Sequence, residues 1–468
     1  MAAPGSHRQR LAALRVAPTA APTSARARVL RVAGAMLVSN GLTVILQIAM
    51  VPALIWAWGA TIYGEWLILY TIPGYLTLSD LGIIATASNR IDAQCARGHY
   101  GAANRTYFNS VLVLGGLIGA IGVVGTLVWM TVGGQFASLF VTLSPSDVVQ
   151  IASVLFADAM VLLVFNHHSA LYRTLGRFNW TVNWQAAGRV APIVALCLAA
   201  LAGAGLLVAA VTMLALRLVF LCAMALSLRR RIGWLRRDWL RASRPETVRL
   251  LRGAVGFMTL PLSNMLYLHV TTLIVAAVSS PVGVAAFATL RTFTRMIPQI
   301  VSIAGRSRWS EIAQAEARGE QDAVRAMRSR VLRQTLGLSA LAAAGYLALG
   351  RPFYLFWTGG ALPFDWLLFW AFLANAVAIA FYYSLEVFLL AVNRVSGYAQ
   401  VFLGATVAQL VAGYLLVEAW GIAAFPITGA VASLGVFMYL LMKIQSQATK
   451  PAAKQSSDRS GAVSKIDK

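Results

Sequence analysis

The feature that most constrains this chain is a series of long apolar runs with few charges and no 3.6-residue stripe. Runs of about 20 apolar residues match a helix that crosses the hydrocarbon core of a bilayer. Inside a bilayer only helices and closed barrels satisfy their backbone hydrogen bonds, and these runs lack the alternation of barrel strands. Only 12% of the 468 residues are charged, against roughly 25% in soluble domains. The sequence therefore predicts an all-α polytopic membrane protein.

Basic residues alternate between the connections of these runs and so predict an orientation. The N-terminal tail contains six arginines and no acid before residue 32, and segment 228–252 contains nine arginines against two acids. The connection between the third and fourth runs contains neither lysine nor arginine. This pattern predicts that both termini are cytoplasmic, and it explains the net charge of +23 without a nucleic-acid partner. Twelve transmembrane helices are predicted, near 34–56, 63–86, 108–131, 150–170, 184–203, 205–227, 253–279, 282–305, 333–350, 366–391, 397–417 and 420–442.

A weak internal repeat divides the chain into halves. Residues 34–64 align without a gap to 253–283, with seven identities in 31 positions. The sequence IDAQCARG (91–98) likewise resembles IAQAEARG (312–319). An even number of helices per half gives a parallel repeat. The predicted organisation is a disordered tail, a six-helix bundle, an arginine-rich linker, a second six-helix bundle and a disordered tail, over 1–31, 32–227, 228–252, 253–443 and 444–468 respectively.

No pattern in the sequence indicates a cofactor, a metal or an enzymatic reaction. The three cysteines lack the spacing of a disulfide framework or a metal site. The chain contains no GxxxxGK[ST] loop for nucleotide phosphates. The outer connections are short, which disfavours a membrane glycosyltransferase. The sequence therefore predicts neither an enzyme nor a bound cofactor.

Two stretches resemble one transporter family. They are VPALIWAWGATIYGEWLILYTIPGYLTLSDLGIIATASNRI (51–91), with its Tyr63-Gly64-x-Trp66 start and Asp80-Leu81-Gly82 end, and SALYRTLGRFNWTVNW (169–184). Both resemble Wzx-type O-antigen and polysaccharide flippases of the multidrug/oligosaccharidyl-lipid/polysaccharide exporter superfamily.

The resemblance implies a two-bundle transporter of the bacterial inner membrane. Such a protein would flip an undecaprenyl-diphosphate-linked oligosaccharide by alternating access, coupled to an ion gradient. The polymer would be an O-antigen, exopolysaccharide or capsule unit. The implied partners are this polyprenyl-linked glycan, membrane lipids and polysaccharide polymerase machinery.

Arginines within the predicted spans are candidates for substrate binding, because charges inside a bilayer are costly and usually functional. Arg291 and Arg295 lie four residues apart and share one helical face. Two guanidinium groups there suit a diphosphate, since arginine binds phosphate oxygens as a bidentate fork. Pairing with a carboxylate of another helix is the alternative. Arg217 and Arg189 are further candidates, although snorkelling also explains Arg189.

The acids within the spans are candidates for ion coupling or gating. Asp158 and Glu386 lie in equivalent helices of the two halves, where a carboxylate can load and release a proton. A salt bridge to one of the arginines named above is the alternative for each. Asp80 is expected to have a gating or structural role at the cytoplasmic end of its helix. Glu65 is expected to be a solvated residue at the outer interface.

A multidrug/cation antiporter of the same fold is the alternative function. Such an antiporter predicts an acidic cavity for cationic drugs and few buried arginines. The excess of arginines within the spans favours the flippase.

Overall fold

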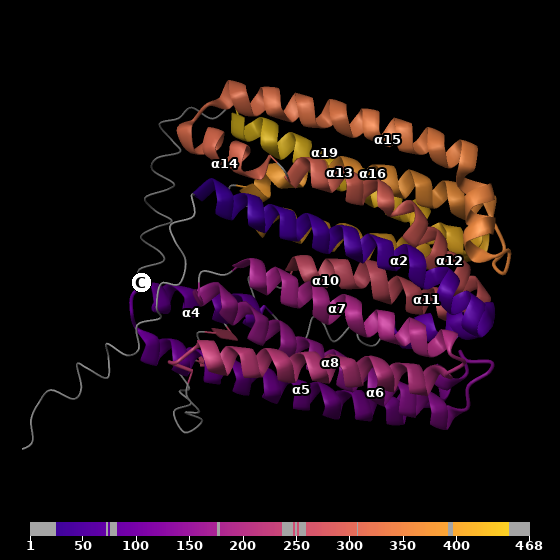
Figure 1. Ribbon diagram of the computed structural model, residues 1–468. Helices are drawn as coiled ribbons and strands as arrows, with labels where there is room; N and C mark the ends of the chain where they lie inside the picture. The colour runs from indigo at the N-terminus through magenta and orange to yellow at the C-terminus, as the bar shows by residue number, and fades with distance from the viewer. Residues whose placement is uncertain are drawn as a thin grey trace, which may run out of the picture. The chain divides into compact units, whose positions relative to one another are not determined.

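The computed structural model describes residues 25–71, 74, 82–175, 178–235, 247–248, 250–251, 259–306, 308–391 and 396–448 (Figure 1). Helices make up nearly all of these residues, and no strand occurs among them. The predicted all-helical class is confirmed for this part of the chain. The predicted tails and the middle of the predicted linker lie largely outside the described residues.

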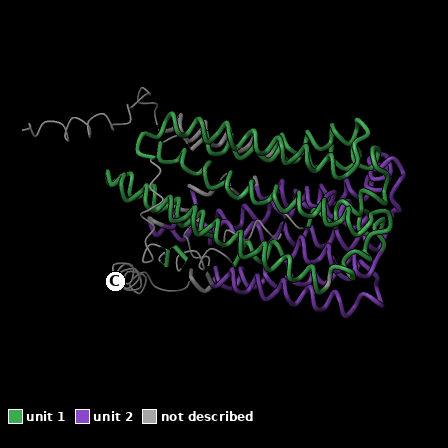
Figure 2. The backbone as a smooth tube through the Cα atoms, turned by 90° about the horizontal axis from the view of Figure 1, so that it is seen from below, with its two compact units in different colours: residues 1–265, 280–285 green, residues 266–279, 286–468 purple. Residues whose placement is uncertain are grey.

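The first compact unit covers residues 1–265 and 280–285 (green in Figure 2). Within it α7 packs against α2 and α8, α8 packs against α6, and α4 packs against α5. Its helices are α2 (Ala25–Leu69), α4 (Ile83–Ala96), α5 (Tyr100–Ala137), α6 (Pro145–Ala170), the 3-10 helix η1 (Leu171–Leu175), α7 (Phe178–Leu201), α8 (Leu206–Arg231) and α10 (Thr259–Met265).

The second compact unit covers residues 266–279 and 286–468 (purple in Figure 2). In it α16 packs against α13, α15 and α19, and α19 also packs against α17. Its elements are the π-helix η3 (Leu266–Val270), α11 (Thr271–Val278), most of α12 (Pro281–Thr294), α13 (Met296–Arg306), α14 (Trp309–Arg318), α15 (Gln321–Thr358), α16 (Trp366–Ala391), α17 (Ser396–Leu415), α18 (Val417–Trp420), the 3-10 helix η4 (Gly421–Ala423) and α19 (Ala424–Ala448).

Nine helices among the described residues are long and apolar enough to cross a membrane. The predicted spans 63–86, 282–305 and 333–350 are not among them. Span 63–86 includes residues outside the described set, and span 282–305 is broken at Arg295 into α12 and α13. Span 333–350 lies in α15, where Arg333, Gln334 and several glycines lower the mean hydropathy of the stretch. The count of twelve spans therefore stays a prediction.

Large apolar side chains are exposed along these helices. On α5 the exposed fraction is 62% for Val123 and 76% for Met130, and on α15 it is 85% for Phe356. Soluble monomers rarely expose broad apolar patches, whereas helices that face lipid do so by necessity. The surface agrees with the multi-pass membrane protein that the sequence predicts.

The Tyr63-Gly64-x-Trp66 motif is a packing element. Tyr63 and Trp66 are almost completely buried, and helix α2 reaches them after a kink at Gly59, where φ is 77° and ψ is 170°. A Cβ atom on Gly64 would lie 1.9 Å from the carbonyl oxygen of Pro281. Glycine is therefore required at position 64 because the backbone at the start of α12 passes directly against α2.

Replacing Gly64 by alanine is expected to lower the free energy of unfolding by about 1–3 kcal/mol, because a backbone atom cannot move aside cheaply. Thermal unfolding of the purified protein in detergent measures this effect. A methyl group on Gly115 of α5 would meet no atom within 4 Å, so Gly115→Ala is the matched control and should leave the unfolding midpoint unchanged or slightly raised. Equal midpoints for the two variants would contradict the close approach.

Glu65 is buried, so its predicted place in solvent at the outer interface is wrong. Its exposed fraction is 0%. One carboxylate oxygen accepts hydrogen bonds from the backbone N–H groups of Val141 (2.6 Å) and Thr142 (2.7 Å), and the other accepts one from the Thr142 hydroxyl. The connection between α5 and α6 leaves these N–H groups without helical partners, and Glu65 supplies the acceptor.

Replacing Glu65 by alanine is expected to lower the free energy of unfolding by about 2 kcal/mol, because two backbone N–H groups and the Thr142 hydroxyl then lose their acceptor. Glu65→Gln keeps one acceptor oxygen and is expected to cost less. Glu418→Gln removes a charge from an exposed side chain and serves as the control. Thermal unfolding ranks the three variants, and a Glu65→Ala midpoint equal to that of Glu418→Gln would argue against the anchoring role.

The second motif, SALYRTLGRFNWTVNW, builds an aromatic cluster in the first unit. The buried Tyr172 donates a hydrogen bond to the Ser227 hydroxyl at 2.8 Å, and its ring lies parallel to that of Trp184. Arg231 of α8 lies over the Trp180 ring, 4.6 Å from its centroid. The residues that resemble the flippase family at this point join η1, α7 and α8.

Candidate functional site

The two predicted phosphate-binding arginines lie in the second unit at a break in the helical path. Arg291 is in the last turn of α12, and Arg295 occupies the position between α12 and α13. Both side chains are half-buried. The structure therefore places the two guanidinium groups close together along the chain, at an interruption that the sequence did not predict.

Arg291 connects α12 to the π-helix η3. Its Nη1 donates to the carbonyl oxygen of Leu268 at 2.9 Å, and its Nη2 donates to the Thr272 hydroxyl at 3.1 Å. The guanidinium also lies 5.6 Å from the centroid of the Phe287 ring. π-Helical turns are rare and occur frequently at functional sites. These bonds fix the orientation of Arg291 through neutral groups.

Arg295 makes no hydrogen bond or ion pair through its side chain with any residue that the structure describes. The charges of Arg291 and Arg295 both act on Tyr267 and His269 of η3. The region around η3 is therefore cationic. Because an arginine in the bilayer interior is costly, this region favours an anionic ligand or bound water.

Polar side chains extend this region toward α16 and α19. The Asn375 amide donates to the Tyr267 hydroxyl oxygen at 3.0 Å, and the Ser433 hydroxyl donates to the Asn375 side-chain oxygen at 3.4 Å. Asn375 is almost fully buried. The network presents hydroxyl and amide groups within the same unit as the two arginines.

Glu386 joins α16 to α17. Its carboxylate accepts a hydrogen bond from the Tyr398 hydroxyl at 2.9 Å, and its side chain is half-buried. The sequence left open whether this acid couples an ion or pairs with an arginine. The structure adds a hydroxyl donor on one carboxylate oxygen, and a carboxylate has lone pairs on both oxygens with which it can also bind a cation.

Asp158 and Arg217 form a buried ion pair in the first unit. The Arg217 Nε lies 2.5 Å from the Asp158 Oδ1, and each side chain is 2% exposed. Arg217 Nη1 also donates to the carbonyl oxygen of Gly188 at 2.7 Å. A Cβ atom on Gly188 would lie 2.4 Å from Phe165, so the glycine permits α6 and α7 to approach closely. Of the two roles that the sequence left open for Asp158, the structure shows the salt bridge.

The two remaining candidates from the sequence are Arg189 and Asp80. Arg189 is exposed, and its Nε donates to the backbone carbonyl of Gln185 at 3.2 Å within its own helix. The exposure of this side chain agrees with snorkelling, the other explanation that the sequence offered for Arg189. Asp80 lies outside the described residues. Arg189 forms no described hydrogen bond or ion pair with Asp158 or Arg217.

A second ion pair lies beyond the ends of the predicted spans. Arg173 of η1 contacts Asp92 of α4 at 2.8 Å and donates to the Asn89 side-chain oxygen at 3.1 Å. Partial burial raises the pKa of the Asp92 carboxyl above its usual value, and the charge of Arg173 acts in the opposite direction. The pair connects the IDAQCARG segment to the SALYRTLG segment.

Sequence reasoning did not select Tyr267, Asn375 or Tyr398. Each is a polar side chain within a long apolar run. Such residues are uncommon in lipid-facing helices, so a polar side chain within an apolar run is a sequence signal for a buried or functional position. Tyr267 and Asn375 are 108 residues apart, so their hydrogen bond could not be predicted from the sequence.

No protein-family model matches this chain, and no curated protein matches it. Solved structures do match. The lipid II flippase MurJ, in an inward closed conformation, superposes with a TM-score of 0.69 at 10% identity, over 88% of this chain and 87% of that chain. An inward-facing multidrug resistance MATE family transporter of the MOP superfamily gives a TM-score of 0.65 at 15% identity, over 88% and 96%.

A third match is a MOP superfamily transporter from Pyrococcus furiosus, for which a binding pocket of reverse polarity suggests a different function. Its TM-score is 0.57 at 15% identity, over 91% of this chain and 96% of that chain. At these identities the likeness shows the fold alone. The chain therefore has the fold of MOP superfamily transporters, at nearly full length. The matched structures include both a flippase and multidrug transporters. The structural similarity therefore does not distinguish the Wzx-type subfamily from the others.

Proposed function

We propose that this protein flips a polyprenyl-diphosphate-linked oligosaccharide across the bacterial inner membrane by alternating access, coupled to an ion gradient. The proposal includes twelve spans in two six-helix bundles, 32–227 and 253–443, with both termini and the 228–252 linker in the cytoplasm. The MOP fold supports transport, and among the matched structures MurJ is a lipid flippase. The glycan would be an O-antigen, exopolysaccharide or capsule unit, delivered to polysaccharide polymerase machinery.

The observation that carries the proposal is the balance of charge within the helices. Asp158 is neutralised by Arg217, whereas Arg295 has no acidic partner among the described residues. The guanidinium of Arg295 is thus a half-buried positive charge without a described counter-charge, as a site for an anion requires. The excess charge therefore matches an anionic substrate.

The residues of the second unit would divide the recognition of such a substrate. Arg295 and Arg291 would bind the diphosphate, since guanidinium groups pair with phosphate oxygens. Tyr267 and Asn375 offer hydroxyl and amide groups of the kind that bind sugar hydroxyls. Glu386 is the candidate for ion coupling within this unit, whereas Asp158 of the first unit is paired with Arg217.

A multidrug/cation antiporter is the second candidate, because the fold is equally that of MATE transporters. In that case Glu386 would take the cation, and the arginines would only stabilise the helices. The two candidates differ in the sign of the substrate charge.

Depletion of the protein in its native host tests the proposal. Polyprenyl-diphosphate-linked glycans are extracted, the leaflet that they face is probed, and surface polysaccharide is measured in parallel. The flippase predicts that the lipid-linked glycan accumulates facing the cytoplasm while surface polymer falls. Unchanged glycans together with increased sensitivity to cationic drugs would support the antiporter instead.

A further inference from the structure

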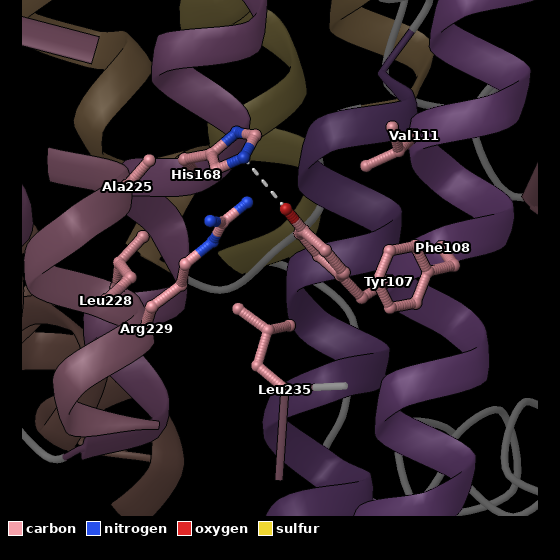
Figure 3. A pocket seen from close by; sticks show the side chains of 8 residues that line it. All are labelled: Tyr107, Phe108, Val111, His168, Ala225, Leu228, Arg229 and Leu235. Atoms are coloured by element: carbon pink, nitrogen blue, oxygen red, sulfur yellow. Dashed lines mark hydrogen bonds between the residues drawn. The ribbon is translucent and has the colours of Figure 1, made fainter. Parts of the chain in front are cut away.

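A cavity of about 390 Å³ lies among α5, α6 and α8 of the first unit, and none of its lining residues belongs to the substrate or ion sites proposed above (Figure 3). Most of its lining is apolar and includes Val111, Leu228 and Leu235. Three polar side chains also line it, namely Tyr107, His168 and Arg229. None of the described lining residues is an acid.

Tyr107 and His168 form a hydrogen-bonded pair on the cavity wall. His168 Nδ1 lies 2.8 Å from the carbonyl oxygen of Val164, which can only accept, so Nδ1 carries the hydrogen. Nε2 then accepts a hydrogen bond from the Tyr107 hydroxyl at 2.9 Å. With His168 neutral, as placed here beside a guanidinium, the only formal charge on the described lining is that of Arg229.

Arg229 points into the cavity. Figure 3 shows its guanidinium directed toward the Tyr107–His168 pair. It makes no hydrogen bond or ion pair with any described residue. Its neighbour Arg231 is different, because that guanidinium lies over Trp180. Arg230 is exposed and does not line the cavity.

The depth of the cavity matches a lipid headgroup. Tyr107 is seven residues after Tyr100, the first residue of α5, and Arg229 is two residues before Arg231, the last residue of α8. At about 1.5 Å per residue, both lie within roughly 10 Å of the helix ends. Basic pockets between transmembrane helices at this level bind acidic lipid headgroups.

We propose that this cavity binds the phosphate of an anionic membrane lipid, with Arg229 on the phosphate and an acyl chain along Val111 and Leu228. The apolar lining favours a lipid over a free anion, because a free phosphate would gain nothing from those walls. The single unpaired guanidinium favours an anionic lipid over a zwitterionic one. This inference does not depend on the substrate proposed above.

Native mass spectrometry of the delipidated full-length protein in detergent tests the inference. Phosphatidylglycerol is titrated, and the dissociation constant of the tightest site is measured for the wild type, Arg229→Gln, Arg230→Gln and Ala225→Phe. Arg229 and Arg230 are both exposed, so neither substitution should affect folding. Ala225 lines the cavity, and phenylalanine there fills it while Arg229 remains.

We expect Arg229→Gln and Ala225→Phe each to weaken phosphatidylglycerol binding at least about fivefold, and Arg230→Gln to leave it unchanged. Phosphatidylcholine should bind more weakly than phosphatidylglycerol, and millimolar inorganic phosphate should not displace the lipid. Equal losses in Arg229→Gln and Arg230→Gln would show general surface attraction and overturn the inference. Displacement by inorganic phosphate would also overturn it, because the site would then be one for free anions.

Discussion

Asp158→Asn is expected to lower the free energy of unfolding by about 3–5 kcal/mol, because breaking a buried ion pair leaves an uncompensated charge. Both side chains of the Asp158–Arg217 pair are 2% exposed, so water cannot replace the lost partner. Arg217→Met should be similarly harmful, since it removes the partner of Asp158 and the donor to the Gly188 carbonyl. Folded yield and thermal unfolding in detergent measure both effects.

The double variant Asp158→Leu/Arg217→Met separates a structural role from ion coupling. Replacing a whole buried pair by apolar residues of similar volume is often neutral or stabilising. We therefore expect the double variant to recover most of the folded yield that either single variant loses. Transport by the recovered protein would assign the pair to structure alone, whereas a folded but inactive double variant would assign Asp158 to the transport cycle. A fully stable Asp158→Asn variant would contradict the role of the pair in folding.

Replacing Arg291 and Arg295 together by alanine is expected to reduce transport about 100-fold, because each charged hydrogen bond to phosphate contributes enough for roughly a factor of ten. Arg295→Ala is the cleaner single variant, since its side chain bonds no described residue and its loss should not affect folding. Arg291→Ala also removes the bonds to Leu268 and Thr272, so its stability has to be measured alongside its transport.

Two controls make the arginine experiment specific. Arg295→Lys keeps the charge but not the planar fork, so we expect it to retain part of the activity. Arg351 is an exposed arginine of α15, and Arg351→Ala should transport normally. Full transport by the stable double alanine variant would remove the assignment of Arg291 and Arg295 to the substrate.

The sequence predicted the features that depend on local composition. The apolar runs located the helices, because the bilayer fixes the length that a spanning segment needs. Helix α16, for example, has the predicted bounds of 366–391. The separation of 184–203 from 205–227 was also correct, since α7 ends at Leu201 and α8 begins at Leu206.

Contacts between residues that are far apart in the sequence could not be predicted from local composition. Glu65 was placed in solvent because its hydrogen-bond donors lie 76 and 77 residues further along the chain. The Asp158–Arg217 pair could be named only as one of several combinations, because 59 residues separate its members. The break at Arg295 and the π-helix at η3 depend on packing between segments, and helical periodicity does not show either of them.

The most direct test of the central proposal is a leaflet assay with the purified protein. A polyprenyl-diphosphate-linked oligosaccharide from the native host is reconstituted into proteoliposomes, and the fraction of glycan accessible to an external glycosidase is followed over time. The flippase predicts that accessible glycan rises beyond the outer-leaflet share with wild-type protein, and that it stays at that share with Arg291→Ala/Arg295→Ala. Equal accessibility in protein-free liposomes and in wild-type proteoliposomes under an imposed ion gradient would contradict the proposed flippase function.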